Sequence, residues 1–181
     1  KSYGEMIEYM DLLVGRLVDA LEELGLRRDT LVIFTTDNGS PRNVTSRFRG
    51  RMVEGGKARL TDEGTHAPFY ANWPGVVPAG GQTDDLVDFT DFMPTFAELA
   101  GIDVPQDRVV DGVSFAPRLL RGEPNGREWV FTEWKGEYWA RDRRWKLYGD
   151  GRFFDMAEDP EEEHPLSNDA LTDEAKQARE K

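Results

Sequence analysis

The feature that most constrains the fold is a short apolar run, Thr30 to Thr36, which is followed by Asp37, Asn38 and Gly39. Its β-branched and aromatic residues, with polar residues on either side, predict a strand buried on both faces in a parallel sheet. In open α/β folds, ligands bind outside the carboxyl ends of such strands. The sequence therefore predicts an α/β fold in which Asp37 and Asn38 project into a ligand-binding crevice.

Asp37 and Asn38 also indicate what could bind there. A carboxylate and an amide oxygen side by side are hard donors, which suit Ca²⁺ or Mg²⁺ better than a thiophilic metal. The alternative is purely structural, because Asp-Asn-Gly is also a common turn sequence. The tripeptide alone leaves both interpretations open.

A long amphipathic helix is predicted before this strand. Apolar residues recur at steps of three and four from Met6 to Leu24, with Ser2 as the N-cap and Gly25 as the stop. Helix, short turn and strand form half of a βαβ unit, so we expect the helix to pack on the parallel sheet.

A segment of about 27 residues, 40–66, follows the strand and shows no convincing periodicity. Loops this long inside a compact domain are usually functional. Residues 42–59 hold six basic residues and one acid, Glu54, and this local positive charge can attract an anion. Within it, Gly55-Gly56-Lys57 lets the backbone approach a bound group and supplies a point charge. For most of the arginines, pairing with the acidic remainder of the chain is the alternative.

The rest of the chain predicts a second strand at 67–73, a short helix ending near Leu99, and then a separate sheet. Beyond residue 126, four short aromatic-rich runs are separated by turn residues such as Asp150-Gly151, which predicts a small antiparallel sheet. The domain boundary is placed near Asn125, so that the domains span 1–125 and 126–181. The tail after residue 157 is acidic and then helix-prone, and the pattern does not decide whether it docks on the sheet.

Composition excludes several classes of partner and chemistry. The net charge of -12 argues against nucleic acid or an anionic membrane as the main partner, and no apolar run is long enough for a membrane span. The chain contains no cysteine, which excludes disulfides, zinc-thiolate sites and a thiol nucleophile within these residues. The chain opens directly on a helix without an initiator Met, so we expect it to be a portion of a longer protein. Its oligomeric state cannot be inferred from these features.

Together, these residues resemble the C-terminal part of the sulfatase family, within the alkaline-phosphatase-like superfamily. Each stretch that carries the resemblance is modest, but their order and spacing are specific and extend over nearly the whole chain. The stretches are Phe34-Thr35-Thr36-Asp37-Asn38-Gly39, Gly55-Gly56-Lys57, Thr61-Asp62-Glu63-Gly64-Thr65-His66-Ala67-Pro68-Phe69, Trp73-Pro74-Gly75, Asp91-Phe92-Met93-Pro94-Thr95, Leu99-Ala100-Gly101-Ile102, Asp111-Gly112-Val113-Ser114, Arg144-Trp145-Lys146-Leu147, Phe154-Asp155-Met156 and Asp159-Pro160.

The resemblance implies a fold and a set of site residues. The fold would be part of an alkaline-phosphatase-like parallel-sheet domain followed by the small antiparallel sheet. Asp37 and Asn38 would be two ligands of one divalent cation, Ca²⁺ with Mg²⁺ as the alternative. Lys57 would bind a sulfate oxygen and offset charge that develops during the reaction. The family usually has a basic residue, often Arg, near His66, so this imidazole is a departure that would touch the anion or the substrate, or brace the loop.

The resemblance also implies a reaction. It is the hydrolysis of a sulfate ester, on a sulfated carbohydrate or another sulfated small molecule. The family's nucleophile is a formylglycine hydrate made from a Cys or Ser in a Cys/Ser-x-Pro-x-Arg stretch, and neither Ser114 nor Ser167 lies in such a stretch. The nucleophile is therefore expected upstream, and the chain alone is expected to lack turnover and to bind calcium poorly. The family also implies export to the periplasm, the extracellular space or the lysosome.

Two other functions are compatible with the same residues. A phosphomonoester or phosphonate hydrolase, or a phosphotransferase, of the same superfamily would use a similar strand-end metal and cationic clamp. Such relatives more often carry Asp-His-Gly where this chain has Asp37-Asn38-Gly39. Alternatively, the basic loop would capture sulfated glycans without cleaving them.

Overall fold

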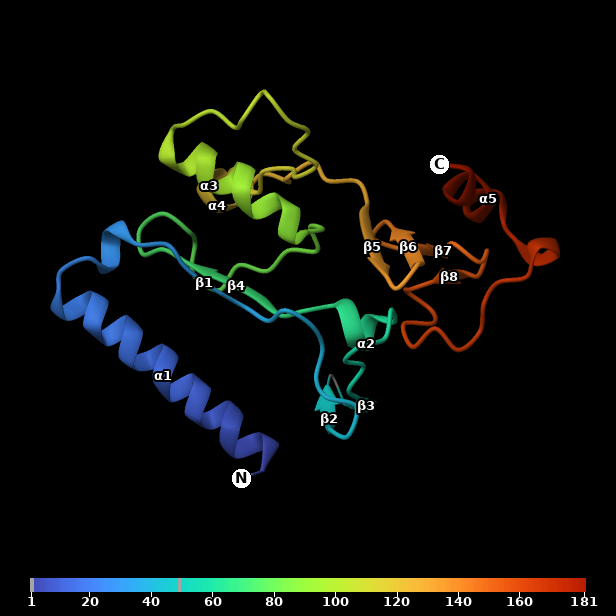
Figure 1. Cartoon of the computed structure of the whole chain (residues 1–181), viewed down its shortest axis with the longest axis horizontal. Coiled ribbons are helices and arrows are strands. Elements are labelled where there is room, and N and C mark those ends of the chain that lie inside the picture. Colours follow the sequence, from blue (N-terminus) through green and yellow to red (C-terminus); the bar gives the residue numbers. More distant parts are fainter. Residues whose placement is uncertain (1, 49) are drawn as a thin grey trace.

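The computed structural model describes residues 2–48 and 50–181. The helical elements, including three short 3-10 turns labelled η, are α1 (Tyr3–Glu23), η1 (Arg27–Asp29), α2 (Asp62–Thr65), η2 (Phe89–Asp91), α3 (Phe92–Ala100), α4 (Ala116–Arg121), η3 (Asn168–Ala170) and α5 (Asp173–Glu180). The strands are β1 (Val32–Thr35), β2 (Thr45–Phe48), β3 (Arg51–Glu54), β4 (Phe69–Asn72), β5 (Val130–Trp134), β6 (Glu137–Arg141), β7 (Trp145–Tyr148) and β8 (Phe153–Asp155). In Figure 1, β1 and β4 lie between α1 on one side and α3 with α4 on the other, and β5–β8 form a separate sheet.

The predicted first helix is confirmed, and its ends follow from local chemistry. Ser2 and Glu5 form a reciprocal capping box at the start of α1, so that side-chain oxygens bind two amides that have no partner within the helix. Beyond the last turn, Gly25 takes a positive φ of 70°. This conformation costs a residue with a side chain more than glycine, and it ends the helix.

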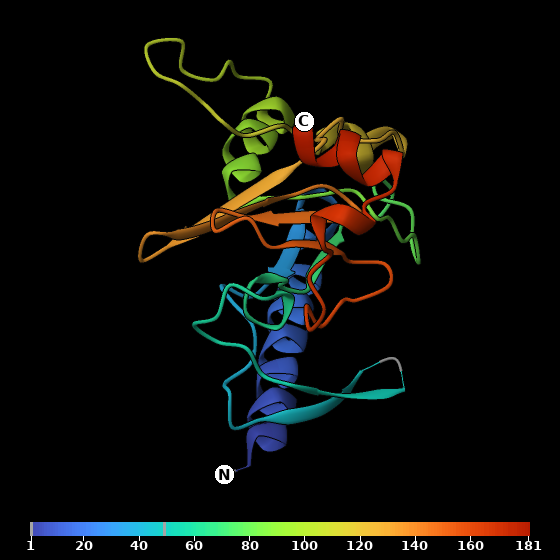
Figure 2. The same cartoon turned by 90° about the vertical axis from the view of Figure 1, so that its right-hand side faces the viewer.

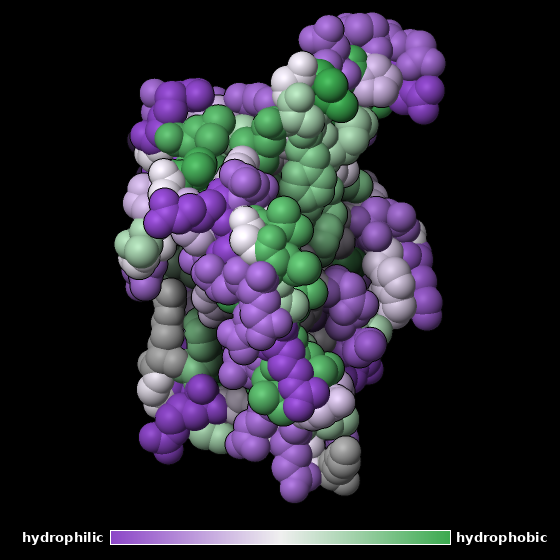
Figure 3. Space-filling model, turned by 90° about the vertical axis from the view of Figure 1, so that its left-hand side faces the viewer, coloured by the Kyte–Doolittle hydropathy of each residue, from purple (hydrophilic) through white to green (hydrophobic). Residues whose placement is uncertain are grey.

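The expected packing of this helix on a sheet is only partly realised. α1, which the structure describes along its whole length, buries none of its residues. A groove of about 320 Å³ separates it from the β1–β4 pair and is lined mostly by apolar side chains, among them Val14, Val18, Val32 and Phe34. Viewed from this side in Figure 3, hydrophobic side chains lie exposed among hydrophilic ones. The helix was predicted from its period, but the period does not fix how closely it packs.

The predicted parallel pairing is wrong for the strands of this chain. β1 pairs with β4 in antiparallel register, with Val32 opposite Asn72 and Thr35 opposite Phe69, and β1 is only partly buried. The 40–66 segment begins and ends beside the carboxyl end of β1. β4 therefore starts next to the end of β1 and runs antiparallel to it. A continuous apolar run indicates burial, but it does not specify strand direction.

The 40–66 segment contains a hairpin that the sequence analysis missed. β2 and β3 pair from Thr45 opposite Glu54 to Phe48 opposite Arg51. Both strands are exposed except at Val53, so neither has the apolar alternation by which a half-buried strand is predicted. This hairpin lies at the lower edge of the molecule in Figure 1, and Arg51 of β3 forms an ion pair of 2.9 Å with Glu161.

The predicted antiparallel sheet is confirmed. Its order is β5-β6-β7-β8, with every neighbouring pair antiparallel. Trp139 and Trp145 are buried, whereas Trp129 and Trp134 are more than two-fifths exposed. The C-terminal tail does dock, because Ala175 of α5 packs against Trp145 and Phe153, and Figure 2 shows α5 lying over the sheet. The boundary near Asn125 stays a prediction.

Candidate functional site

Glycines let three segments cross in direct contact just beyond β1. The amide of Gly39 donates a hydrogen bond of 2.9 Å to the carbonyl oxygen of Gly64, and the amide of Gly56 donates one of 3.2 Å to Glu63. A Cβ atom on Gly39 would lie 1.7 Å from the Glu63 oxygen, and one on Gly56 would lie 2.4 Å from the Glu63 carbonyl carbon. Only glycine permits this approach. We call Gly39, Gly55, Gly56 and Gly64 the glycine crossing.

The glycine crossing places the backbone of Lys57 beside the end of β1. Its amide donates a hydrogen bond of 3.0 Å to the carbonyl oxygen of Ser40. The guanidinium of Arg42 donates to the carbonyl oxygens of Lys57, at 2.9 Å, and Ala58, at 2.7 Å. The Lys57 side chain is exposed. Ser40, to which the Lys57 amide is bound, follows Asp37 by three residues and Asn38 by two. The Lys57 backbone is therefore close in space to the two predicted metal ligands.

Asp37 and Asn38 offer free oxygen atoms at this strand end. Asn38 donates through Nδ2 to the carbonyl oxygen of Gly39 at 2.9 Å, and its own carbonyl accepts from Thr36 Oγ1 at 3.0 Å. Among the described residues, no hydrogen bond or ion pair engages Asn38 Oδ1 or the exposed Asp37 carboxylate. These two oxygen donors fit a hard divalent cation.

Two donors are fewer than such a cation requires. Ca²⁺ takes about six to eight oxygen ligands. Across residues 2–48 and 50–181, no three His, Asp or Glu side chains are grouped closely enough to hold a metal ion. Asp37 and Asn38 therefore fit part of a coordination shell, and the sequence prediction for them remains a prediction.

His66 follows α2 and lies two residues beyond Gly64 of the glycine crossing. Its amide donates to the Asp62 carbonyl oxygen at 2.8 Å, which closes the turn. The imidazole is 77% exposed, and its Nδ1 is 3.8 Å from Asp62 Oδ2. Burial raises the pKa of Asp62, but the charges of Arg141 and Lys146 outweigh it and hold that pKa below its ordinary value. The imidazole therefore lies beside a carboxylate and is open to solvent.

Arg42 is a site residue to which the sequence analysis gave no individual role. It was counted only as one of the basic residues of the loop, yet its guanidinium fixes two consecutive carbonyl groups. The sequence holds no signal for this contact, because the partners are backbone atoms 15 and 16 residues away.

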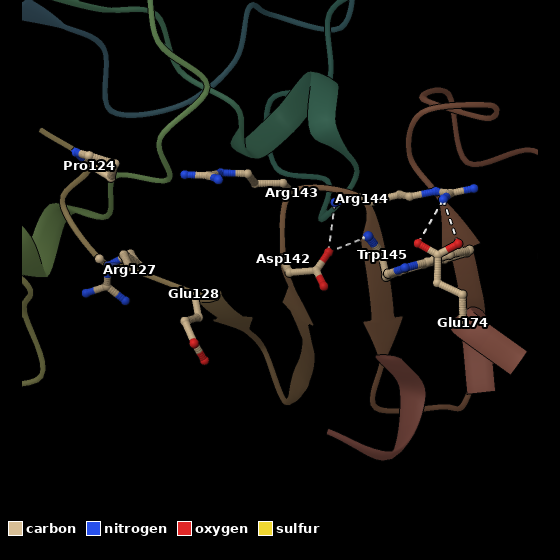
Figure 4. Close-up of a pocket in the computed structure, with 9 residues that line it drawn as sticks. Pro124, Arg127, Glu128, Asp142, Arg143, Arg144, Trp145 and Glu174 are labelled. Carbon is tan, nitrogen blue, oxygen red and sulfur yellow. Dashed lines mark hydrogen bonds and ion pairs between the residues drawn. The ribbon is translucent and has the colours of Figure 1, made fainter. Parts of the chain in front are cut away.

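A larger hollow lies elsewhere, between the start of β5 and α5 (Figure 4). It measures about 490 Å³, and its charged lining comprises three arginines and three acids, Arg127, Arg143, Arg144, Glu128, Asp142 and Glu174. Arg127 binds Asp91, Arg143 binds Asp85, and Arg144 binds both Asp155 and Glu174. Because these arginines are already paired, this hollow offers an anion less than the exposed Lys57 does.

Comparison with known proteins identifies the family. Residues 1–102 match the family described as Sulfatase, and residues 56–181 match the one described as N-sulphoglucosamine sulphohydrolase, C-terminal. Mouse (Mus musculus) steryl-sulfatase is 38% identical over 136 residues, covering 72% of this chain and 22% of that protein. Human (Homo sapiens) arylsulfatase D is 32% identical over 169 residues, covering 90% of this chain and 28% of that protein.

A solved structure agrees with these sequence relatives. The structure of BT1596, a 2-O GAG sulfatase, superposes with a TM-score of 0.66 and 31% identity, over 86% of this chain and 35% of that one. The fold and the sequence comparisons thus define a domain of the sulfatase type. The chain belongs to the sulfatase family, and it spans less than a third of the length of the two curated relatives.

Proposed function

We propose that the protein of which this chain forms part is a sulfuric ester hydrolase that acts on a sulfated carbohydrate. One observation carries the proposal: the glycine crossing joins the Asp37–Asn38 strand end to the backbone of Lys57. Asp37 and Asn38, which supply oxygen atoms for a cation, and Lys57, which supplies an ammonium group for an anion, then lie on two segments that are in contact. The match of residues 56–181 to the C-terminal part of N-sulphoglucosamine sulphohydrolase and the name of the GAG sulfatase support a carbohydrate substrate.

In this proposal Asp37 and Asn38 provide two ligands for a divalent cation, Ca²⁺ with Mg²⁺ as the alternative. When bound, such a cation polarises the sulfate oxygens as a Lewis acid. The Lys57 ammonium binds a sulfate oxygen and stabilises negative charge that develops on it. His66, exposed at the end of α2, contacts the sulfate or the sugar.

The nucleophile belongs to another part of the protein in this proposal. It is the formylglycine expected in a Cys/Ser-x-Pro-x-Arg stretch upstream, so the 181-residue chain binds the anion without turning it over. An exported location, periplasmic, extracellular or lysosomal, is also part of the proposal and is based on the family alone.

The test is anion binding by the chain itself. Sulfate is titrated into the ¹⁵N-labelled chain with and without Ca²⁺, and the shifts of the Lys57 and His66 amides are followed. Sulfate binding should weaken about tenfold in K57A, because one charge-assisted hydrogen bond is lost, and Ca²⁺ should change it little, because the described part of the chain supplies only two of the oxygen ligands that the cation requires. R47A is the matched control, since it removes an exposed cation from the β2–β3 hairpin of the same segment.

Two outcomes contradict the proposal. K57A and R47A weakening sulfate binding equally would indicate a diffuse charge effect rather than a site at Lys57. Measurable hydrolysis of an aryl sulfate by the pure chain would contradict the placement of the nucleophile elsewhere.

A further inference from the structure

A buried lysine of the C-terminal sheet lies under the loop that carries Lys57 and His66. Lys146, on β7, has a fully buried side chain. Its Nζ is 2.7 Å from Glu162 Oε1, 3.0 Å from the Leu60 carbonyl oxygen and 3.3 Å from Asp62 Oδ1. The ammonium also lies 4.5 Å from the centroid of the Trp139 ring. We call Leu60, Asp62, Trp139, Arg141, Lys146, Tyr148 and Glu162 the Lys146 cluster.

The Lys146 cluster is electrically balanced. Arg141 binds both carboxylate oxygens of Asp62, at 2.8 and 2.7 Å, so two cations face two carboxylates. Burying four charges costs a large desolvation energy, and a well-packed apolar set is often at least as stable. Stability alone therefore gives no reason for a lysine at this position.

The hydrogen bonds of the cluster converge on one short segment, residues 60–62. The Leu60 carbonyl oxygen accepts from Trp139 Nε1 at 2.7 Å, from Lys146 Nζ and from the Tyr148 hydroxyl at 3.1 Å. The Asp62 amide donates to Glu162 Oε1 at 2.9 Å. The Tyr148 hydroxyl also contacts a Glu162 carboxylate oxygen, so its single hydrogen is shared between the two oxygen atoms. The sheet thus fixes both the entry to α2 and its first residue.

From α2 the contacts continue into the glycine crossing. Gly64 accepts the hydrogen bond of Gly39, and Glu63 accepts that of Gly56, the residue before Lys57. Each contact is between backbone atoms, in a space where a Cβ could not fit. A displacement of α2 would therefore move the backbone on both sides of the candidate site.

We propose that Lys146 is a positioning residue, which holds α2 and through it sets the spacing between Lys57 and the Asp37–Asn38 strand end. This role rests on the proposed function, because what it tunes is the affinity for the sulfate group. The C-terminal sheet then acts on anion binding without any of its side chains touching the anion.

The experiment compares K146M with R127M. Methionine fills the lysine volume without an ammonium group, and Arg141 still faces Asp62. R127M removes a cation from the buried Arg127–Asp91 ion pair, which lies away from α2. Hydrogen exchange of the Gly39 and Gly56 amides and the dissociation constant for inorganic sulfate are measured for both. Global stability, measured by urea unfolding, provides the reference for the exchange rates.

In K146M, exchange of both glycine amides should accelerate about tenfold beyond the change explained by global stability, and sulfate should bind about tenfold more weakly. In R127M both quantities should follow global stability only. If K146M does not fold, Y148F takes its place, since it removes one donor to the Leu60 oxygen and the bond to Glu162.

Unchanged glycine exchange in K146M overturns the proposal, and so does faster exchange with unchanged sulfate affinity, which would make the cluster merely structural. If the wild-type chain binds no sulfate, the proposed anion site fails instead. The exchange rates of Gly39 and Gly56 then decide by themselves whether Lys146 holds the loop.

Discussion

At the scale of single residues, the site depends on positions where a side chain is absent. A hypothetical Cβ on Gly55 would lie 2.1 Å from the Pro41 carbonyl oxygen, and one on Gly64 would lie 2.2 Å from the Arg59 carbonyl oxygen, so these two glycines are as necessary as Gly39 and Gly56. None of the four takes a positive φ, so their requirement is space rather than backbone conformation. The sequence analysis expected Gly55 and Gly56 to let the backbone approach a bound group. The structure places them against the backbone of Pro41 and Glu63, and the approach to a bound group stays a prediction.

We therefore predict that G39A destabilises the chain by about 1–3 kcal/mol or more, because the new methyl group overlaps the Glu63 carbonyl oxygen. G15A is the control: it lies within α1, where a Cβ meets no atom within 4 Å, and it should stabilise by about 0.5–1 kcal/mol. Urea unfolding followed by circular dichroism measures both. Equal stability of G39A and the wild type would refute the close contact.

At the scale of elements, helices and strands differ in how firmly they are held. α1 exposes Leu13 and Leu17 to 44% and 56%, whereas β8 buries Phe153 and Phe154 to 1%. The hydrophobic period predicted both kinds of element correctly. It could not distinguish a helix that buries its apolar face from one that leaves it open, because burial depends on what other segments supply.

This difference predicts contrasting effects of truncation. L17A should change the free energy of unfolding by less than about 0.5 kcal/mol, because more than half of the leucine is exposed. F153A should cost about 3–5 kcal/mol, since it removes a ring stacked on Trp145, with centroids 5.3 Å apart. Thermal or urea unfolding of the two variants checks the contrast. A large loss for L17A would mean that α1 packs more closely than the structure has it.

At the scale of the whole molecule, buried ion pairs join segments far apart in sequence. Asp62 pairs with Arg141, and Asp91 pairs with Arg127. Through them β6 is attached to α2, and the segment just before β5 is attached to the start of α3. Removing one partner of such a pair leaves an uncompensated buried charge, so each pair should stabilise the contact between the segments that it joins.

The pH dependence of stability follows from the Asp62 carboxylate. Its folded-state pKa lies below the ordinary 3.8, since Arg141 and Lys146 outweigh the opposing effect of burial. The ionised Asp62 carboxylate therefore contributes its full stabilisation at pH values above the ordinary pKa of 3.8. This contribution is lost as the pH falls through the lower folded-state pKa. We predict that D62N is less stable at pH 7 and loses less stability on acidification from pH 5 to pH 2. Unfolding midpoints measured across this range test it; parallel curves for both proteins would contradict it.

Local structure could be predicted from the sequence: the capped first helix, the strand that leads to Asp37, the helix ending near Leu99 and the four-stranded sheet. Periodicity, caps and turn residues act between near neighbours, so they can be read along the chain. The tertiary structure alone decided the antiparallel pairing of β1 with β4, the exposed face of α1, the docking of α5 and the contact of Gly39 with Gly64. These depend on which distant segments meet, and no residue pattern within one segment records its partner.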